Sequence, residues 1–328
     1  MKSFYCECGH HLFFDSTECV SCGRPVAFDP QSLDMQVLEP AADNGRGLCA
    51  NGSEYHVCNW LQTNSERIFC LACDLNRTIP NLAEPINQTR WAGLEAGKKR
   101  LIYSLLRLQL PIVSRHVDET GLCFDFLEDG RTNAQKFGDV FHHTGYADGV
   151  ITINVLEADP AAREATREAM NEQYRTVLGH MRHESGHYFY EKLFDQIDHE
   201  KLKRLFGDFS RDYATDLQRY YDNGPPEDWS REFISAYSSA HPLEDWAESW
   251  AHYLHLTDAL ETAAAHGILT NVEQLDFTEK LGQWRKLSIV LNELNRGFGV
   301  SDAYPFVISE RAGEKLVFVH DLIRSINS

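Results

Sequence analysis

Hydrophobic and polar residues alternate along one short stretch and follow helical spacing along most of the rest of the chain. Residues 149–155, GVITINV, place Val150 and Thr152 on one side and Ile151 and Ile153 on the other, which is the two-residue period of a β-strand. The segment GLCFDFLE is a second strand-like run that precedes it. Short strands followed by a series of helices predict the α+β class.

Helix boundaries are marked by proline, glycine and capping residues. Asp159 is expected to cap a helix that starts at Pro160, and Pro242 and Gly267 are expected to mark the start and the end of another. The segment 174–194 has the length and apolar content of a mostly buried helix. Other helices are expected at residues 91–110, 199–209, 211–224, 272–296 and 309–326.

Residues 76–91 separate a cysteine-rich N-terminal part from the rest of the chain. The stretch NRTIPNLAEPINQTRW holds two prolines and several asparagine and threonine residues, so it is expected to be an extended linker on a surface. Eight of the nine cysteines precede it. We therefore expect a zinc-ribbon domain at residues 1–90 and a second domain at residues 91–328.

The eight cysteines form two sets whose spacing is typical of structural zinc sites. A CxC pair and a CxxC pair, each followed by glycine, make up the first set, and four such thiolates suit a tetrahedral zinc ion. The second set ends in CLAC and is more loosely spaced in its first half. The alternative for both is free buried cysteines, and Cys123 is expected to be a core residue. The sets are Cys6, Cys8, Cys19 and Cys22, then Cys49, Cys58, Cys70 and Cys73.

Charge and composition exclude several functions. The formal net charge is −18, and residues 1–90 hold six Lys/Arg against eleven Asp/Glu, so nucleic acid and anionic membrane surfaces are both disfavoured as partners. The ribbon is therefore expected to have a structural role or to dock a protein, with zinc supplying folding energy. The chain has no apolar run that could span a membrane and no secretory signal at its start, which predicts a cytoplasmic protein.

The stretch GHMRHESGHYFYEKL carries residues suited to metal-dependent hydrolysis. His183 and His187 are four residues apart, so both imidazoles project from one helix face and can bind one metal ion. Glu184 follows the first of them and could take a proton from a metal-activated water. The pattern fixes only three positions, so a helix with a chance match is the alternative until a third ligand is found.

A glutamate on a later helix can supply the third ligand. The metzincin arrangement needs glycine and histidine soon after His187, and YFYEKL contains neither. Glu244 is the expected ligand, and Glu248, one turn later on an apolar helix, is expected to accept a hydrogen bond from a ligating histidine. The reverse assignment, with Glu248 as the ligand, stays open. His180 is a further candidate for the supporting role, with a core or surface position as the alternative.

Two resemblances strengthen this interpretation. HESGH followed by EDWAE is similar to the ExFAE pattern of gluzincin peptidases, in which the first glutamate binds zinc. In gluzincins of the anthrax lethal factor type, a tyrosine seven residues before that glutamate stabilises the oxyanion, which implies this role for Tyr237. The whole chain, from CECG and CVSCG through YRTVLGHMRHESGHYFYEKL to HPLEDWAESWAHYLH, resembles zinc-binding metallopeptidases that carry an N-terminal zinc ribbon.

The resemblance implies a mainly helical, zincin-like domain with a small sheet, acting as a zinc-dependent hydrolase of peptide or amide bonds. Glu184 would be the general base and Tyr237 the oxyanion stabiliser, and the cofactors would be one catalytic and two structural zinc ions. The alternative is a zinc-ribbon adaptor or regulator with an inactive zincin domain. By analogy with zincin folds, the residues expected to pair with an extended substrate are Gly149, Val150, Ile151 and Thr152.

Overall fold

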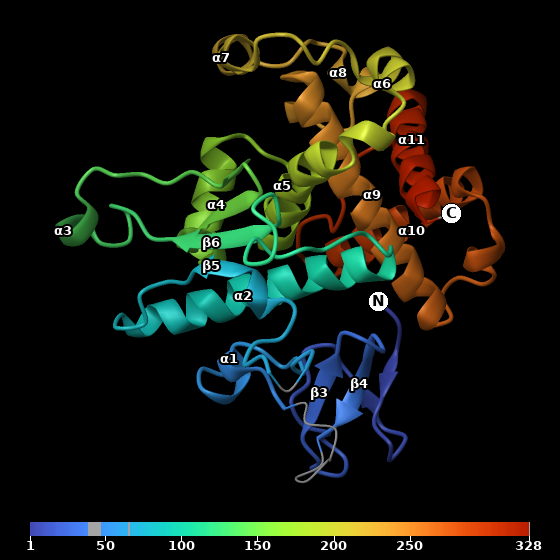
Figure 1. Ribbon diagram of the computed structural model, residues 1–328. Coiled ribbons are helices and arrows are strands. Elements are labelled where there is room, and N and C mark those ends of the chain that lie inside the picture. The colour runs from blue at the N-terminus through green and yellow to red at the C-terminus, as the bar shows by residue number, and fades with distance from the viewer. Residues whose placement is uncertain (39–46, 65, 328) are drawn as a thin grey trace. The chain divides into compact units, whose positions relative to one another are not determined.

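The computed structural model divides the chain into two compact units. Figure 1 shows its helices and strands, coloured by residue number. Cysteine-bearing hairpins and a small mixed sheet precede a helical part, so the predicted α+β class is confirmed. The predicted domain boundary near residue 90 lies inside the first unit and stays a prediction. The units are Lys2–Met181 and Met1 with Arg182–Ser328, and the described residues are 1–38, 47–64 and 66–327.

Two small antiparallel hairpins open the first unit. β1 (Phe4–Tyr5) pairs with β2 (His11–Leu12), and β3 (Val26–Asp29) pairs with β4 (Asp34–Val37). The one-turn helix α1 (Ala50–Ser53) follows. Packed aromatic rings form the core of this segment, and they bury a large apolar area for so short a chain. They centre on Phe28, whose ring contacts those of Phe4, Phe14, Trp60 and Tyr103.

A four-stranded mixed sheet comes next, in the order β5–β6–β8–β7. β5 (Asn76–Thr78), β6 (Cys123–Leu127) and β8 (Val150–Asn154) are parallel, and β7 (Gly145–Ala147) runs antiparallel to β8. Most residues of β6 and β8 are buried, which explains their nearly continuous apolar sequence. They are the two strands that the hydrophobic pattern predicts.

The position of β8 inside the sheet corrects one expectation. Val150, Ile151 and Thr152 each face one residue of β6 and another of β7, so both hydrogen-bonding sides are used. Gly149 lies in the turn between β7 and β8 with φ of 81°, and its carbonyl accepts from the Cys123 backbone nitrogen at 2.9 Å. An extended substrate therefore cannot add to the sheet at these residues. Among the described strands, β7 provides the outer edge on that side.

The helix α2 (Pro85–Arg107) replaces much of the predicted linker. Residues 76–91 were expected to be extended, but β5 occupies their start and α2 begins at Pro85. Proline suits the first helical position because its fixed φ is helical and its missing N–H has no partner there. The helix packs on the sheet, and the buried Lys98 Nζ lies 5.7 and 5.5 Å from the ring centres of Phe124 and Phe126.

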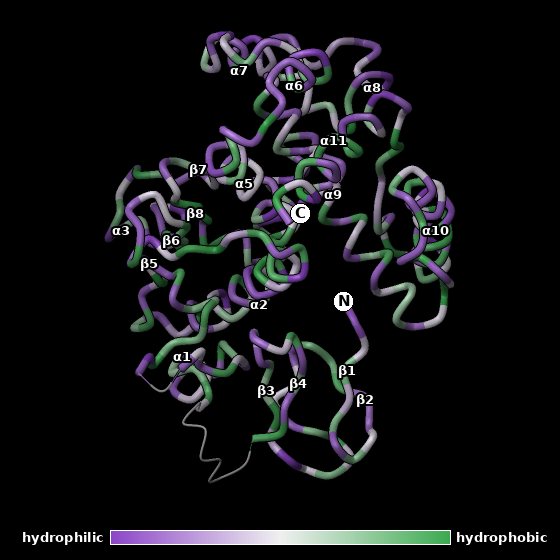
Figure 2. The backbone as a smooth tube through the Cα atoms, turned by 45° about the vertical axis from the view of Figure 1, so that its right-hand side comes forward, coloured by the Kyte–Doolittle hydropathy of each residue, from purple (hydrophilic) through white to green (hydrophobic). Residues whose placement is uncertain are grey.

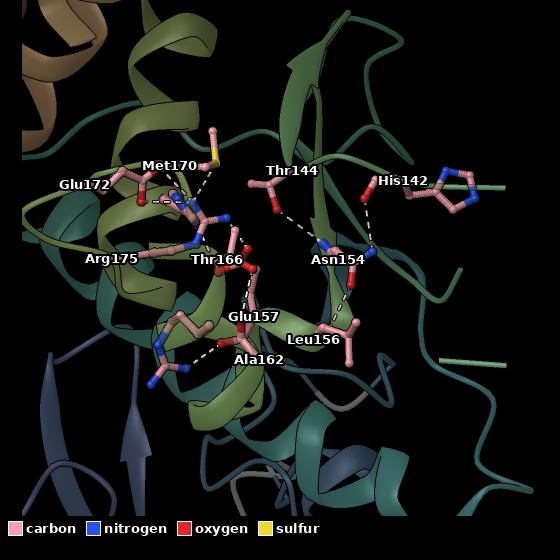
Figure 3. Close-up of polar contacts among 12 residues, drawn as sticks. His142, Thr144, Asn154, Leu156, Glu157, Ala162, Thr166, Met170, Glu172 and Arg175 are labelled. Atoms are coloured by element: carbon pink, nitrogen blue, oxygen red, sulfur yellow. Dashed lines mark hydrogen bonds and ion pairs between the residues drawn. The ribbon is translucent and has the colours of Figure 1, made fainter. Parts of the chain in front are cut away.

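The chain leaves β8 through a hydrogen-bonded corner (Figure 3). Asn154 accepts from the Leu156 backbone nitrogen at 2.9 Å and donates through Nδ2 to the His142 carbonyl at 3.0 Å. The carboxylate of Asp159 then accepts from two backbone nitrogens of the next helix, so the predicted cap is confirmed. The other helices of this unit are α3 (Ala134–Phe137) and α4 (Pro160–Ala169).

The second unit is helical, and its long helices lie close to the predicted ranges. α9 and α11 lie side by side (Figure 1), joined by a buried ion pair in which Lys315 donates to Asp245 at 2.6 Å. Within the described chain, every helix is too short or too polar to cross a bilayer. The helices are α5 (Val177–Lys192), which begins in the first unit, α6 (His199–Phe206), α7 (Tyr213–Asn223), α8 (Trp229–Glu232), α9 (Pro242–Ala265), α10 (Phe277–Gly297) and α11 (Glu310–Ile326).

The helices α5 and α9 approach each other most closely at Gly186. A Cβ atom at this position would lie 2.8 Å from the Cα atom of Ala247, so only glycine fits. Two buried indoles lock the contact: Trp246 Nε1 donates to the Gly186 carbonyl at 2.8 Å, and Trp250 Nε1 donates to Ser185 Oγ at 3.1 Å. The relative position of the two helices is therefore defined by both packing and hydrogen bonds.

Gly186→Ala is expected to lower the free energy of unfolding by about 1–3 kcal/mol, because the added methyl group must displace the α9 backbone. Gly282→Ala is the matched control. Gly282 lies within α10, and an added Cβ there would meet no atom within 4 Å, so this change should raise stability by about 0.5–1 kcal/mol. Urea unfolding followed by circular dichroism compares the two, and equal effects would contradict the close contact.

Candidate metal centres and active site

Three side chains from two helices converge where α5 meets α9. His183 and His187 lie one turn apart on α5, and Glu244 lies in the first turn of α9. The Nε2 atoms of the histidines are 3.2 Å apart. Oε2 of Glu244 is 3.0 Å from Nε2 of His183 and 3.7 Å from Nε2 of His187. The structure thus brings together the three residues predicted as ligands.

The separations of these three atoms fit a small tetrahedral ion. Zinc binds nitrogen and oxygen at about 2.0–2.1 Å, which places neighbouring ligand atoms of a tetrahedron about 3.3 Å apart. The observed separations of 3.0, 3.2 and 3.7 Å lie on either side of this value. Two imidazoles and one carboxylate are a donor set of catalytic zinc sites, where a fourth position serves water or substrate. The residues present therefore fit zinc.

Buried carboxylates make this point favourable for positive charge. Burial alone would lower the pKa of His183, but Glu244 and Glu248 outweigh it and raise that pKa well above its usual range. Burial would raise the pKa of Glu244, but His187 and His183 outweigh it and hold that pKa well below its usual range. Glu244 therefore stays ionised, and the field that favours a proton on His183 also favours a divalent cation.

Glu248 lies behind His183 and orients it. His183 Nδ1 donates to Glu248 Oε1 at 2.7 Å, which leaves Nε2 facing His187 and Glu244. Of the two predicted assignments, the geometry favours Glu244 as the ligand and Glu248 as the support. His252 is a second histidine near Glu248, with its Nε2 atom 3.9 Å from Oε2 of Glu248. Burial lowers the pKa of His252 to about 4, so this imidazole is neutral at pH 7.

Two further predicted residues, Glu184 and Tyr237, belong to the same unit as the three candidate ligands. Glu184 follows His183 on α5 and is 7% exposed. The ring of Tyr237, in a 3₁₀ turn before α9, is centred 5.9 Å from that of His183. Within the described residues, neither the Glu184 carboxylate nor the Tyr237 hydroxyl makes a hydrogen bond or ion pair. Burial and the charge of Glu244 raise the pKa of Tyr237, so its hydroxyl stays protonated as a donor.

Tyr213, at the start of α7, is a site residue that the sequence analysis missed. Its hydroxyl donates to Oε1 of Glu244 at 2.6 Å, and its ring packs edge-on against that of His241 at 5.2 Å. Tyr213 is 41% exposed, and partial burial of its hydroxyl together with the charge of Glu244 raises its pKa above the usual range, so it remains a donor. The contact joins positions 31 residues apart on different helices. No short-range spacing in the sequence indicates it.

The first cysteine group has the geometry expected of a tetrahedral thiolate site. Sγ of Cys6 is 3.7 Å from that of Cys22, and Sγ of Cys8 is 3.6 Å from that of Cys19. Four sulfurs bound to zinc at about 2.3 Å would lie about 3.8 Å apart. Cys8 and Cys22 are exposed, and hydrogen bonds from Arg24 lower the pKa of Cys22 to about 6. The group therefore lies at the surface, with one thiol readily ionised.

The second cysteine group is completely buried. Sγ of Cys58 and Sγ of Cys70 are 3.7 Å apart, and Glu95 and Lys98 of α2 form a buried ion pair beside Cys73. Burial alone would lower the pKa of Lys98, but Glu95 and Cys73 outweigh it and raise that pKa. A charged lysine there offsets negative charge on the thiolates. The group comprises Cys49, Cys58, Cys70 and Cys73.

His180 lies beside Glu157, with Nδ1 3.4 Å from Oε2. Arg175 binds the other oxygen of Glu157 and also contacts Glu172 at 2.8 Å (Figure 3). Burial would raise the pKa of Glu157, but His180 and Arg175 outweigh it and lower that pKa to about 2. A supporting role of His180 for the metal ligands stays a prediction.

Comparison with known families covers almost the whole chain. The family described as "Putative zinc-binding metallo-peptidase" matches residues 87–322, and a zinc-ribbon domain family matches residues 3–84. The first match alone spans well over half of the sequence. The chain belongs to the zinc-binding metallopeptidase family. Zinc is the metal that both family descriptions support, in agreement with the two four-cysteine groups.

Members of similar length occur in mycobacteria. Uncharacterized proteins of Mycobacterium tuberculosis (strain ATCC 25618 / H37Rv) and Mycobacterium bovis are each 38% identical to this chain over 341 residues. Each alignment covers 99% of this chain and 96% of the relative. The likeness therefore includes the cysteine-rich segment as well as the helical part. No solved structure matches the chain.

Glu248→Gln is expected to weaken zinc binding at the histidine site about 10–100-fold, because a neutral amide orients and polarises His183 less strongly than a carboxylate. Competition with a fluorescent chelator measures the change. Glu227→Gln, which alters an exposed glutamate of the same unit, is the matched control and should leave affinity unchanged. Equal zinc affinities of the two variants would contradict the supporting role of Glu248.

Proposed function

We propose that this metallopeptidase hydrolyses peptide or amide bonds at a zinc ion bound by His183, His187 and Glu244. The observation that carries the proposal is the convergence of three ligand atoms next to Glu184. Glu184 is 7% exposed, and its carboxylate has no hydrogen-bond partner among the described residues. A chance HExxH pattern on a structural helix would need neither feature. The ligand set corresponds to the gluzincin type.

Each side chain has a separate role in the proposed reaction. When bound, zinc would lower the pKa of a water molecule to about 7 and polarise the carbonyl group under attack. Glu184 takes a proton from the attacking water and passes it to the leaving nitrogen. Tyr237 donates its hydroxyl hydrogen to the oxyanion, which its raised pKa supports. Glu248 holds His183 in the ligating orientation.

The two cysteine groups are proposed as structural zinc sites, which brings the number of zinc ions to three per chain. Four thiolates without an open position suit a structural ion. Such thiolates must stay reduced, which supports the proposed cytoplasmic location. The substrate is proposed to be a peptide, a protein or another amide-bearing molecule, because the ligand set and the general base suit attack on an amide carbonyl.

Protein docking through the ribbon is a second proposal, and exposed aromatic side chains favour it. Tyr5 and Phe13 are 58% and 73% exposed and flank His11, with ring centres 5.5 and 5.3 Å from that of His11. Aromatic residues are enriched at protein interfaces. An adaptor with an inactive zincin part would use this surface alone. The intact Glu184 and Tyr237 favour the enzyme over that alternative.

Glu184→Gln is expected to abolish hydrolysis and to leave zinc content at three ions per chain. The amide cannot accept the proton, so turnover should fall by about 10²–10⁴-fold or more. A peptide library digested by the wild type and the variant, with cleavage sites read by mass spectrometry, measures this and reveals the specificity. Metal content is measured on the same samples.

Glu227→Gln is again the control, with wild-type turnover expected. Hydrolysis by Glu184→Gln at the wild-type rate would rule out the proposed base. Absence of hydrolysis in the fully loaded wild type, combined with capture of a protein through Tyr5 and Phe13, would favour the adaptor.

Tyr237→Phe is expected to lower kcat about 10²–10³-fold with zinc content unchanged, because one hydrogen bond to the oxyanion is lost. Tyr221→Phe is a suitable control, since Tyr221 lies nearby on α7 but is 56% exposed. Steady-state kinetics on a cleaved library peptide compares them. A change in KM alone for Tyr237→Phe would contradict an oxyanion role.

A further inference from the structure

The two oxygens of Glu244 have different partners. Oε2 faces the imidazoles, 3.0 Å from His183 Nε2, and Oε1 accepts a hydrogen bond of 2.6 Å from the Tyr213 hydroxyl. A carboxylate held in this way offers one oxygen to a metal ion and keeps the other away from it. Tyr213 therefore determines which oxygen of Glu244 faces the imidazoles. It contacts no other predicted ligand in the described part of the chain.

Few side chains of α7, the helix that carries Tyr213, are buried. Asp216 is the only buried residue among those of α7, and its ion pairs are with Arg211 and Arg219 of the same segment. Figure 2 shows α7 as a mainly hydrophilic stretch. Gly207 and Gly224, both with positive φ, lie on either side of it. Few buried apolar contacts mean that local opening of such a helix costs little free energy.

The contacts that hold α7 are directed at the candidate site. Tyr213 binds Glu244 and packs against His241, and the ring of Tyr220 packs edge-on against that of Tyr237 at 5.8 Å. His241, Tyr237 and Glu244 all belong to the turn and first residues of α9. A helix with little core is thus attached to Glu244 and Tyr237 of the proposed reaction and to His241 beside them.

We propose that Tyr213 is a positioning residue for Glu244 and that docking of α7 regulates metal affinity at the histidine site. The proposal rests on the proposed function, since it takes Glu244 as a metal ligand. If docked α7 strengthens metal binding by some factor, then metal binding strengthens the docking of α7 by the same factor, because the two equilibria are linked. α7 is then the element through which a substrate or partner that contacts it would change the metal site.

Loss of the Tyr213 hydroxyl frees Oε1. Glu244 can then rotate, or bind an ion through both oxygens, so the coordination number and geometry change. This effect on the metal is specific to a positioning residue, and general destabilisation would not produce it.

The first experiment measures the metal itself. Tyr213→Phe and the control Tyr221→Phe are titrated with Zn²⁺ and Co²⁺ against a chelator. Tyr213→Phe is expected to bind about 10–100-fold more weakly at the histidine site, with the cysteine sites unchanged. Its Co²⁺ visible absorption should weaken as the coordination number rises. Tyr221→Phe should match the wild type in both measurements, because the Tyr221 hydroxyl is exposed and makes no hydrogen bond within the described chain.

The second experiment measures α7 by hydrogen exchange with mass spectrometry, on the full chain with and without Zn²⁺ at the histidine site. Peptides spanning α7 should exchange more slowly in the zinc-loaded wild type. In Tyr213→Phe, exchange should be about tenfold faster or more without metal, and the protection by zinc should be smaller. Peptides from α10 serve as an internal reference.

Equal zinc affinity of Tyr213→Phe and Tyr221→Phe would overturn the proposal, and so would α7 exchange that does not respond to metal. Neither readout depends on hydrolysis, so a protein that fails to cleave any peptide leaves both tests valid. If His183→Ala binds metal as tightly as the wild type, the proposed metal site itself is wrong. Hydrogen exchange of α7 in metal-free Tyr213→Phe would still report on the hydrogen bond between Tyr213 and Glu244.

Discussion

The close contact between α5 and α9 is the constraint on which the candidate site depends. His183 and His187 come from one helix and Glu244 and Glu248 from the other, so their separations are set by the distance between two backbones. Gly186 allows that distance, and the indole hydrogen bonds across the contact maintain it. The ligand atoms are therefore held in place by the rigid interior of the unit, as precise metal sites require.

The candidate metal centres differ in which charges are buried and in what offsets them. At the histidine site, buried carboxylates create a negative field that a cation relieves. At the second cysteine group, the thiolates are the negative charges, and the buried Lys98 offsets part of them. At the first group, solvent reaches Cys8 and Cys22 and screens the charge instead. The three sites thus differ in how easily water and competing ligands can reach an ion.

Local spacing predicts the ligands but not the contacts between distant elements. The pairing of His183 with His187 follows from helix geometry, and the start of α9 at Pro242 follows from capping chemistry, so both are evident in the sequence. The bond from Tyr213 to Glu244 depends on the path of the chain between two helices, which periodicity does not encode. For the same reason, the alternation within β8 revealed a strand but not its two neighbouring strands, which occupy the positions where an extended substrate was expected to pair.

The spacing of the metal centres along the chain also sets the order in which a ribosome completes them. The last cysteine of the two groups is Cys73, whereas Glu244 completes the histidine site. At about 5–20 residues per second, roughly ten to thirty seconds of translation separate the two. The cysteine segment can therefore draw on the cell's zinc while the rest of the polypeptide is still being made.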